Sequence, residues 1–165
     1  YDKEMFVDGT YKAYDKDGKV YKIRTGSTNS YSKILNPLDS GSEMEFYDNG
    51  NLNSLRKFKN SKEIFYERYN EDGSISYKVF YEKGRITKKV WYLDDGSMLH
   101  QTIYKPNNVV EETRYGFDGK LQSFIVTKNN KVISGYNYSA SGKKTKMSEA
   151  QLYKEQKSKD LFNFR

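Results

Sequence analysis

The sequence of 165 residues contains no cysteine, one histidine, one tryptophan and two prolines. The lack of cysteine excludes a disulfide framework, a cysteine-based zinc site and a thiol nucleophile, and the single His100 excludes a metal site with several histidine ligands. No apolar run approaches the roughly 18 residues that a membrane-spanning helix needs. Only 35% of the residues are hydrophobic, whereas 16% are aromatic. We therefore predict a sheet-rich protein with a thin or open core.

A repeat of 23 residues organises the chain, because glycines recur at this interval at Gly50, Gly73, Gly96, Gly119 and Gly142. An aromatic residue stands four positions before each glycine, and Asn, Asp or Ser stands one position before it. A further copy of the motif contains Gly18, which lies 32 residues before Gly50. The motif predicts hairpins with three-residue turns, in which the glycine takes the left-handed conformation and forms a bulge.

A second class of turn lies half a period away, at Asn60-Ser61, Lys83-Gly84, Pro106-Asn107 and Asn129-Asn130. Asn and Gly tolerate positive φ and therefore predict two-residue hairpin loops, whereas Pro106 requires another turn type. A turn every 11 or 12 residues indicates a series of short strands. The predicted fold class is all-β, an antiparallel β-hairpin meander built from 23-residue repeats in an elongated, largely single-layer twisted sheet.

Both faces of this sheet carry apolar residues. Four columns of the repeat are expected to share one face, which is the better core candidate: the column that starts at Phe46, that of Leu52 and Ile75, that of Phe58, Tyr81 and Tyr104, and that of Ile86, Val109 and Val132. The other face has Phe80 and Ile103 among charged residues. A two-layered sandwich would need one clean apolar face per sheet, so we favour a single layer.

The expected domain organisation is one β-hairpin repeat array over residues 1–147, followed by a C-terminal helix and tail over residues 148–165. The wider interval before Gly50 implies an irregular insertion at about residues 25–45, a stretch rich in Ser, Asn and Gly. Ser148 and Gln151 have the spacing of a capping box, and the residues after them lack Gly and Pro. A short helix is therefore expected to cap the last repeat.

The period and the motif resemble the bacterial variant of the MORN repeat, as in YNEDGSISYKVFYEKGRI at 69–86 and WYLDDGSMLHQTIY at 91–104. The resemblance covers about residues 6–145. It implies an elongated hairpin array; some proteins of this kind are described as antitoxin components, and eukaryotic relatives act as membrane-associated scaffolds and dimerisation modules. The glycine pair that closes each unit of the eukaryotic repeat is missing here.

Two other repeat families are also similar. The same motif resembles the tyrosine-aspartate repeats of large bacterial toxin shells, where the arrays are much longer. Trp91-Tyr92 and Gly96-Ser97-Met98 resemble the choline-binding repeat of surface proteins, but that family needs a Trp in nearly every unit for its cation-π cage.

Motifs for catalysis or metal binding are few. His100 occupies the repeat column of Ser54 and Tyr77, which marks it as a variable strand position, and no nucleophile motif accompanies it. The stretch Asp15-Lys16-Asp17-Gly18 superficially resembles a calcium loop, but Gly26 stands where the loop requires a bidentate Glu, so turn formation is the better interpretation. We expect no enzymatic activity, no cofactor and no metal.

Tyrosine-rich surfaces favour a non-catalytic scaffold that presents an aromatic sheet face to a protein partner. The alternatives are an envelope or surface protein that grips glycan, and a basic aromatic platform for single-stranded nucleic acid. The latter is suggested by residues 51–91, which carry ten Lys and Arg against five Asp and Glu. The predicted binding residues are Phe80, Tyr81, Arg85, Lys89, Trp91, Tyr92 and Tyr104.

Two expectations concern assembly and location. Exposed edge strands would allow a homodimer by sheet extension, although charged edges oppose it. The sequence begins with Tyr1 rather than Met, so we expect a leading segment to have been removed, which favours an exported or cell-envelope location over the cytoplasm.

Overall fold

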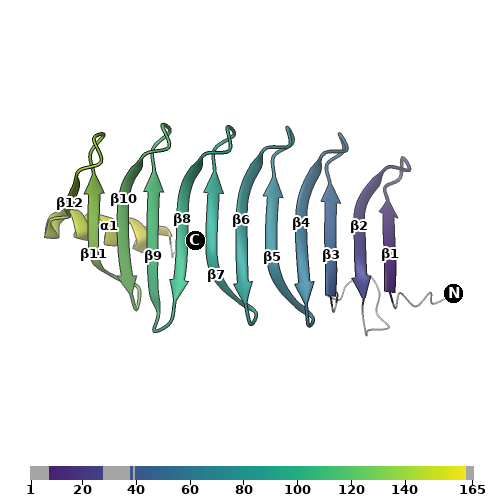
Figure 1. Ribbon diagram of the computed structural model, residues 1–165, viewed down its shortest axis with the longest axis horizontal. Coiled ribbons are helices and arrows are strands. Elements are labelled where there is room, and N and C mark those ends of the chain that lie inside the picture. The colour runs from purple at the N-terminus through teal and green to yellow at the C-terminus, as the bar shows by residue number, and fades with distance from the viewer. Residues whose placement is uncertain (1–7, 28–37, 39, 163–165) are drawn as a thin grey trace. The chain divides into compact units, whose positions relative to one another are not determined.

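The computed structural model describes residues 8–27, 38 and 40–162. Twelve antiparallel strands pair in sequence order in one open sheet, and a single helix follows them (Figure 1). The prediction of an antiparallel hairpin meander with a C-terminal helix is confirmed. The elements are β1 Asp8–Tyr14, β2 Val20–Ser27, β3 Ser40–Phe46, β4 Leu52–Lys59, β5 Lys62–Tyr69, β6 Ile75–Glu82, β7 Arg85–Tyr92, β8 Met98–Lys105, β9 Val109–Tyr115, β10 Leu121–Lys128, β11 Lys131–Tyr138, β12 Lys144–Lys146 and α1 Glu149–Phe162.

The repeat glycines close three-residue turns. In the turn between β3 and β4, the Tyr47 N–H donates to the Asn51 carbonyl (2.9 Å) and the Gly50 N–H donates to the Tyr47 carbonyl (2.9 Å). The Asn49 side-chain oxygen accepts from the Asn51 N–H at 2.9 Å. The six glycines of these turns have φ between +73° and +89°, a region that residues with a Cβ occupy at a cost. The Asx-Gly motif thus reverses the chain at a fixed interval.

The second class of turn also uses positive φ. Asn60 with Ser61, Lys83 with Gly84, and Asn129 with Asn130 all have positive φ, as type I′ loops of two residues require. Between β8 and β9 the loop is longer. Lys105 pairs with Val109 there, and the residues with positive φ are Asn107 and Asn108, because Pro106 cannot adopt that conformation.

The expectation that all four columns share one face is wrong. Phe46 pairs with Leu52, whereas Phe58 pairs with Gly41. Directly paired residues share a face, and Gly41 and Phe46 lie an odd number of positions apart on one strand, so they face opposite ways. Phe46 and Phe58 are therefore on opposite faces. The cause is a bulge, because the register shifts between the Phe46–Leu52 and Glu45–Ser54 pairs and the extra residue reverses the alternation.

The chain divides into two compact units. Unit 1 comprises residues 1–86 with 94–96, and unit 2 comprises residues 87–93 with 97–165. The 23-residue repeat runs through this division without a break. Most of the insertion expected at about residues 25–45 lies outside the described residues, although β2 and β3 extend into it from both sides and pair from Ser27 with Ser40 to Lys22 with Glu45.

Helix α1 begins as the sequence predicts. The Ser148 N–H donates to the Gln151 side chain (2.9 Å) and the Gln151 N–H donates to Ser148 Oγ (3.4 Å), which is the reciprocal pattern of a capping box. The helix lies across one face of β9–β11 in unit 2 (Figure 1). Side chains of the helix and of Met147, which precedes it, approach closely at Gly135, where a Cβ would lie 3.2 Å from Leu152 Cδ2 and 2.5 Å from Met147 Sδ.

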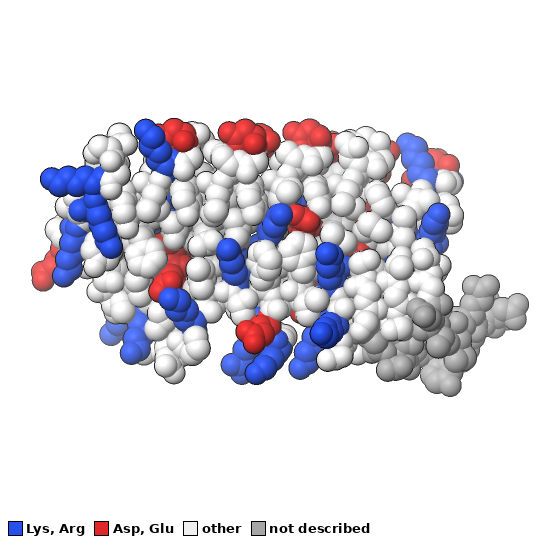
Figure 2. All heavy atoms as spheres, viewed as in Figure 1, with Lys and Arg blue, Asp and Glu red and all other residues white. Residues whose placement is uncertain are grey.

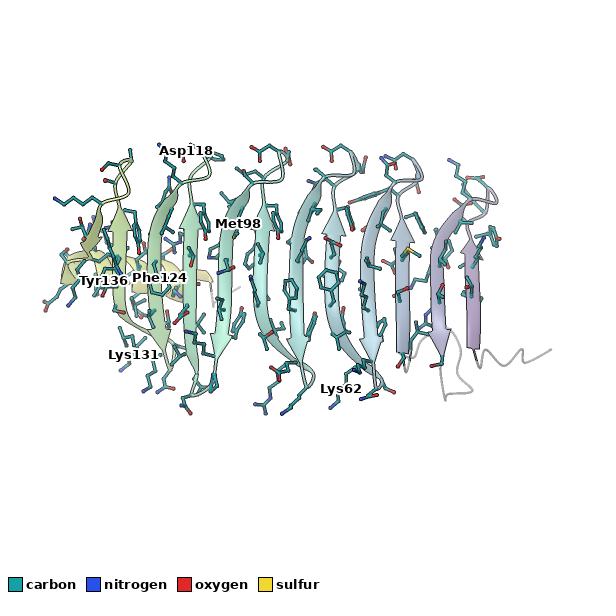
Figure 3. All side chains as sticks on the ribbon, viewed as in Figure 1. Lys62, Met98, Asp118, Phe124, Lys131 and Tyr136 are labelled. Carbon is teal, nitrogen blue, oxygen red and sulfur yellow. The ribbon has the colours of Figure 1, made fainter. Side chains whose placement is uncertain are left out.

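The opposite face of these strands carries aromatic residues. Phe124 of β10 pairs directly with Tyr136 of β11 (Figure 3), and both are neighbours in sequence of the residues that face α1. Asp118 and Lys131 mark the two ends of the strands in this unit (Figure 3). In unit 2, the helix therefore covers one face of the sheet. On the other face, the side chains are half-buried by contact with one another.

Candidate functional site

The predicted binding residues do not form one surface. Phe80 and Tyr81 are consecutive on β6, and Trp91 and Tyr92 are consecutive on β7, so each pair is split between the two faces of the sheet. Arg85 is the first residue of β7 and is exposed. Tyr92 pairs with Met98, whereas Trp91 pairs with His100 on the other face.

Three of the predicted residues do come together in unit 2. Trp91 stacks on His100 with ring centroids 4.9 Å apart and planes at 21°, and the Lys89 ammonium lies 6.0 Å from the centre of the Tyr104 ring. Burial lowers the pKa of His100. Burial, together with the charge of Glu112, raises the pKa of Tyr104. Because the His100 ring covers one side of the indole, only part of Trp91 is available as a platform for a sugar or a base.

Phe80 belongs to a cluster of side chains on β5 and β6 that make ring contacts, an ion pair and a hydrogen bond with one another. It meets Phe65 edge-on at 5.3 Å between ring centroids. On the same face, the Glu67 carboxylate pairs with Lys78 Nζ (2.8 Å) and accepts from the Tyr69 hydroxyl (2.7 Å). Burial and this hydrogen bond raise the pKa of Tyr69 to about 12. These contacts tie β5 to β6, so we assign this cluster a structural role.

The other face of β4–β6 in unit 1 is rich in tyrosine and arginine. Pairing places Arg56 opposite Tyr66 and Arg68 opposite Tyr77; Tyr81 lies four positions beyond Tyr77 on β6 and so shares its face. We call these five residues the tyrosine–arginine face. The Tyr66 and Tyr77 rings are 5.5 Å apart, and the Arg56 guanidinium lies 5.4 Å from the centre of the Tyr66 ring.

Hydrogen bonds hold several of these side chains in place. Tyr81 is hydrogen-bonded to Glu63, and burial, followed by the charge of Glu63, raises the pKa of Tyr81. Burial also raises the pKa of the Glu63 carboxyl, although the charge of Arg56 opposes that shift. Burial and a hydrogen bond to Tyr77 raise the pKa of Tyr66. These hydrogen bonds orient the hydroxyl groups of Tyr66 and Tyr81 on this face.

Arg68 is the exposed cation of this face. Burial of part of the group opposes its charge, but hydrogen bonds to Tyr47 and Tyr77 and the neighbouring phenols raise its pKa. The Tyr47 hydroxyl in turn donates to the Tyr69 carbonyl at 2.7 Å. Among the described residues, no carboxylate pairs with Arg68. Tyrosines orient its guanidinium without neutralising its charge.

The neighbouring charges, by contrast, neutralise one another. Glu43 is nearly buried and lies 2.9 Å from Arg24, 3.4 Å from Lys22 and 3.6 Å from Arg56. Lys22 also pairs with Glu45 at 3.0 Å. Burial opposes the charge of Glu45, but its hydrogen bond to Lys22 and the lysine charge outweigh that effect and lower its pKa. This network joins β2, β3 and β4 and takes the place of an aliphatic core.

Sequence reasoning found Tyr81 on this face but missed Arg56, Tyr66, Arg68 and Tyr77. Arg68 occupies the position five residues before the repeat glycine, which is held by Trp91 and Arg114 in the next copies. Variation of that column between large cationic and aromatic residues was a usable signal. The bulge in each hairpin hid this signal, because it shifts the alternation of side chains between the two faces by one residue.

The two ends of the strands in unit 1 differ in charge. Exposed Asp48, Glu71, Asp72, Asp94 and Asp95 gather at the Asx-Gly turns, whereas exposed Lys59, Lys62, Lys83 and Arg85 lie at the other turns. Figure 2 shows mostly acidic groups at the edge of the Asx-Gly turns, with basic groups at its two ends, and mostly basic groups with a few acidic ones at the opposite edge. The basic edge is the surface that a nucleic-acid ligand would use. The predicted aromatic residues lie mostly on the strands rather than at this edge.

A hollow of about 590 Å³ lies at the Asx-Gly turns of β1–β2 and β3–β4. Its lining includes apolar Val20, Ile23 and Phe46 beside polar residues of the turn at Gly50. The Lys19 ammonium donates to the Asp48 carbonyl across it at 3.2 Å. The hollow is suited to an apolar side chain and carries no set of catalytic groups.

The described residues contain no cluster of three or more His, Asp or Glu side chains arranged to hold a metal ion. None of the helical residues described forms a segment long and apolar enough to cross a membrane.

No known family model matches the chain, and no curated protein matches it either. Among solved structures, the chain is similar to a crystal structure of TcdB2-TccC3 without its hypervariable C-terminal region. The sequence identity is 16% and the TM-score is 0.27, over 81% of this chain and 7% of that one.

Proposed function

We propose that the protein is a non-catalytic repeat scaffold that binds a protein partner through the tyrosine–arginine face. The observation that carries this proposal is the arrangement of Arg56, Tyr66, Arg68, Tyr77 and Tyr81, which are gathered on one side of β4–β6 and held by contacts with one another. Tyr and Arg dominate binding energy at protein interfaces. Tyr also buries a large area at little cost in side-chain entropy.

The state of these side chains supports binding to a protein. The three tyrosines are half-buried and Arg68 is exposed, so part of the entropy cost of ordering them has been met before a partner arrives. The repeat motif supports the proposal that the chain is a bacterial MORN-variant protein, a group in which scaffolding is the expected role. The bulged turns fix the strand register on which this face depends, but they contribute no residue to it.

Site-specific photocrosslinking tests the proposal. Benzoylphenylalanine replaces Tyr77 on the tyrosine–arginine face or, as the matched control, Phe80 on the opposite face of the same strand. After irradiation in lysate of the source cells, we expect one protein to be trapped from position 77 and not from position 80. The trapped protein is then purified, and its binding is expected to weaken on Tyr66→Ala and Tyr77→Ala substitution. Equal trapping from both positions, or none, would contradict the proposal.

Two further measurements separate the alternatives. Saturable quenching of Trp91 fluorescence by cell-wall sugar fragments would favour a glycan ligand. Binding of single-stranded DNA that falls steeply with salt and is lost on substitution of Lys59, Lys62 and Lys83 would favour nucleic acid at the basic edge. Either result, combined with no trapping from position 77, would replace the proposed function.

A further inference from the structure

Arg68 and Arg114 occupy the same position of the repeat. Each lies five residues before its glycine, Gly73 or Gly119. Strand pairing gives them the same setting. Arg68 lies between Ser54 and Tyr77, and Arg114 lies between His100 and Ser123. The two arginines therefore occupy equivalent positions, on the same face of the sheet, in two copies of the repeat.

In unit 2 this position binds a carboxylate on a helix. The Arg114 guanidinium donates two parallel hydrogen bonds to Glu155 of α1, at 3.1 and 2.9 Å. The contacts around it are also polar: Lys159 Nζ lies 2.6 Å from Glu112 and 2.9 Å from Thr127 Oγ1, and the Val132 N–H donates to the Gln156 side chain at 2.7 Å. This face of the repeat thus accepts a helix through charged and polar groups, with an Arg–Glu fork at the centre.

In unit 1 the equivalent arginine is prepared for the same contact. Arg68 is exposed, and its hydrogen-bond partners are the phenols of Tyr47 and Tyr77. A guanidinium has more N–H donors than the bonds to Tyr47 and Tyr77 use, and its planar fork matches a carboxylate. The acidic side chains that contact the tyrosine–arginine face are already engaged, because Glu63 is hydrogen-bonded to Tyr81 and Glu43 pairs with Arg24, Lys22 and Arg56.

We propose that Arg68 anchors a carboxylate side chain of an acidic helical segment, belonging to a partner protein, that lies across β4–β6. The inference rests on the proposed function and names the chemistry of the partner. Charge complementarity supports an acidic occupant, because the tyrosine–arginine face carries Arg56 and Arg68, and the exposed Lys59, Lys62, Lys83 and Arg85 lie at the ends of the same strands and of β7.

The occupant differs from α1 in two respects. Tyr66 stands in the repeat column that holds Glu112 and Gly135 in unit 2. A partner lysine equivalent to Lys159 would therefore find an aromatic ring instead of a carboxylate, so the segment needs no cation there. The segment also crosses above the Tyr66 ring, whereas α1 approaches the backbone at Gly135, where a Cβ would lie 3.2 Å from Leu152 Cδ2. Small apolar side chains on the segment suit this crossing.

A defined probe tests the inference on the full chain. The probe is a fluorescent helical peptide of Ala and Glu, held helical by a side-chain staple, and the control peptide has Gln in place of Glu. Binding is followed by fluorescence anisotropy. We expect the Glu peptide to bind saturably and the Gln peptide to bind at least about tenfold more weakly, since a hydrogen bond to a charged group contributes about 1.5–3 kcal/mol.

Variants locate the contact. Arg68→Gln is expected to weaken binding of the Glu peptide about tenfold or more, and Arg68→Lys is expected to fall between Gln and Arg because it keeps the charge but loses the fork. Lys62→Gln, at the exposed turn after β4, removes the same charge elsewhere and should change affinity less than about twofold. Circular dichroism melts of each variant establish that it is folded.

Three outcomes overturn the inference: no saturable binding of the Glu peptide, equal binding of the Gln peptide, or equal losses for Arg68→Gln and Lys62→Gln. The last would indicate attraction by net charge alone. If photocrosslinking from position 77 traps a protein while the Glu peptide fails to bind, the proposed function stands and the acidic-helix inference falls. If neither experiment succeeds, both fall.

Discussion

Met147 donates its backbone N–H to the Gly135 carbonyl at 2.9 Å, and its Sδ lies 2.5 Å from the point that a Cβ on Gly135 would occupy. The chain between β12 and α1 therefore still runs beside β11, and the Met147 side chain occupies the space that a side chain on Gly135 would need. This contact explains why the helix lies on the last repeat: the equivalent positions of the four preceding copies are Glu112, Lys89, Tyr66 and Glu43, all with large side chains.

Gly135→Ala is expected to destabilise the protein by about 1–3 kcal/mol, the usual cost of overpacking. Met147→Ala should recover part of that loss in the double variant, because it removes the atom that the new methyl group meets. Ser134→Ala, one position away on the other face, serves as the control. Urea unfolding curves measure all four proteins, and equal stability of Gly135→Ala and wild type would contradict the close approach.

Arg114→Gln and Glu155→Gln should each loosen α1. Both side chains are partly exposed, at 40% and 21%, so the expected loss of global stability is at most about 1 kcal/mol. Hydrogen exchange of the α1 amides should quicken more than exchange in β4–β6. In the double variant the two effects should be non-additive. Additive effects would show that the two side chains do not interact.

The repeat turns depend on backbone conformation rather than on space. Gly73 has φ +89°, and a Cβ there would meet nothing within 4 Å. Gly73→Ala is expected to cost about 1–2 kcal/mol, Gly73→Asn less because Asn tolerates the left-handed region, and Gly73→Val more because it is β-branched. Thermal unfolding measures the order of the three variants. A Gly73→Val protein as stable as wild type would contradict the turn assignment.

Tyr69 should make stability depend on pH in alkaline solution. Its pKa rises from 10.0 to about 12 on folding, so the folded state holds this proton more tightly than the unfolded chain. The stabilisation is present below pH 10.0 and is lost as pH rises towards 12. The melting temperature of wild type should exceed that of Tyr69→Phe at pH 9, and the difference should shrink above pH 10.0. Tyr14→Phe, at an exposed site, is the control, and a difference that stays constant through this range would refute the assignment.

The sequence was sufficient for the meander because each turn is encoded locally. Gly50, its equivalents and the Asn-rich turns specify positive φ residue by residue, and Ser148 with Gln151 specifies the start of the helix. These signals require no knowledge of distant parts of the chain.

The faces and the binding surface could not be predicted in the same way. A bulge shifts side-chain alternation by one residue, and nothing in the residues around Leu52 and Ser54 shows which of them pairs with Phe46. The place of α1 depends on Gly135 and Arg114, which are distant from Glu155 in sequence. The setting of Arg68 could not be predicted because its partners come from other elements, Tyr47 from the turn between β3 and β4 and Tyr77 from β6.

Both proposals require that Tyr66 and Tyr77 share one face of unit 1 while Phe65 and Phe80 share the other. Nuclear Overhauser contacts between aromatic rings, measured on protein with selectively labelled Tyr and Phe, test this most directly. We expect contacts between Tyr66 and Tyr77, whose centroids lie 5.5 Å apart, and between Phe65 and Phe80 at 5.3 Å. Contacts of Tyr66 with Phe80, or of Phe65 with Tyr77, would show that the register is shifted and that the tyrosine–arginine face does not exist.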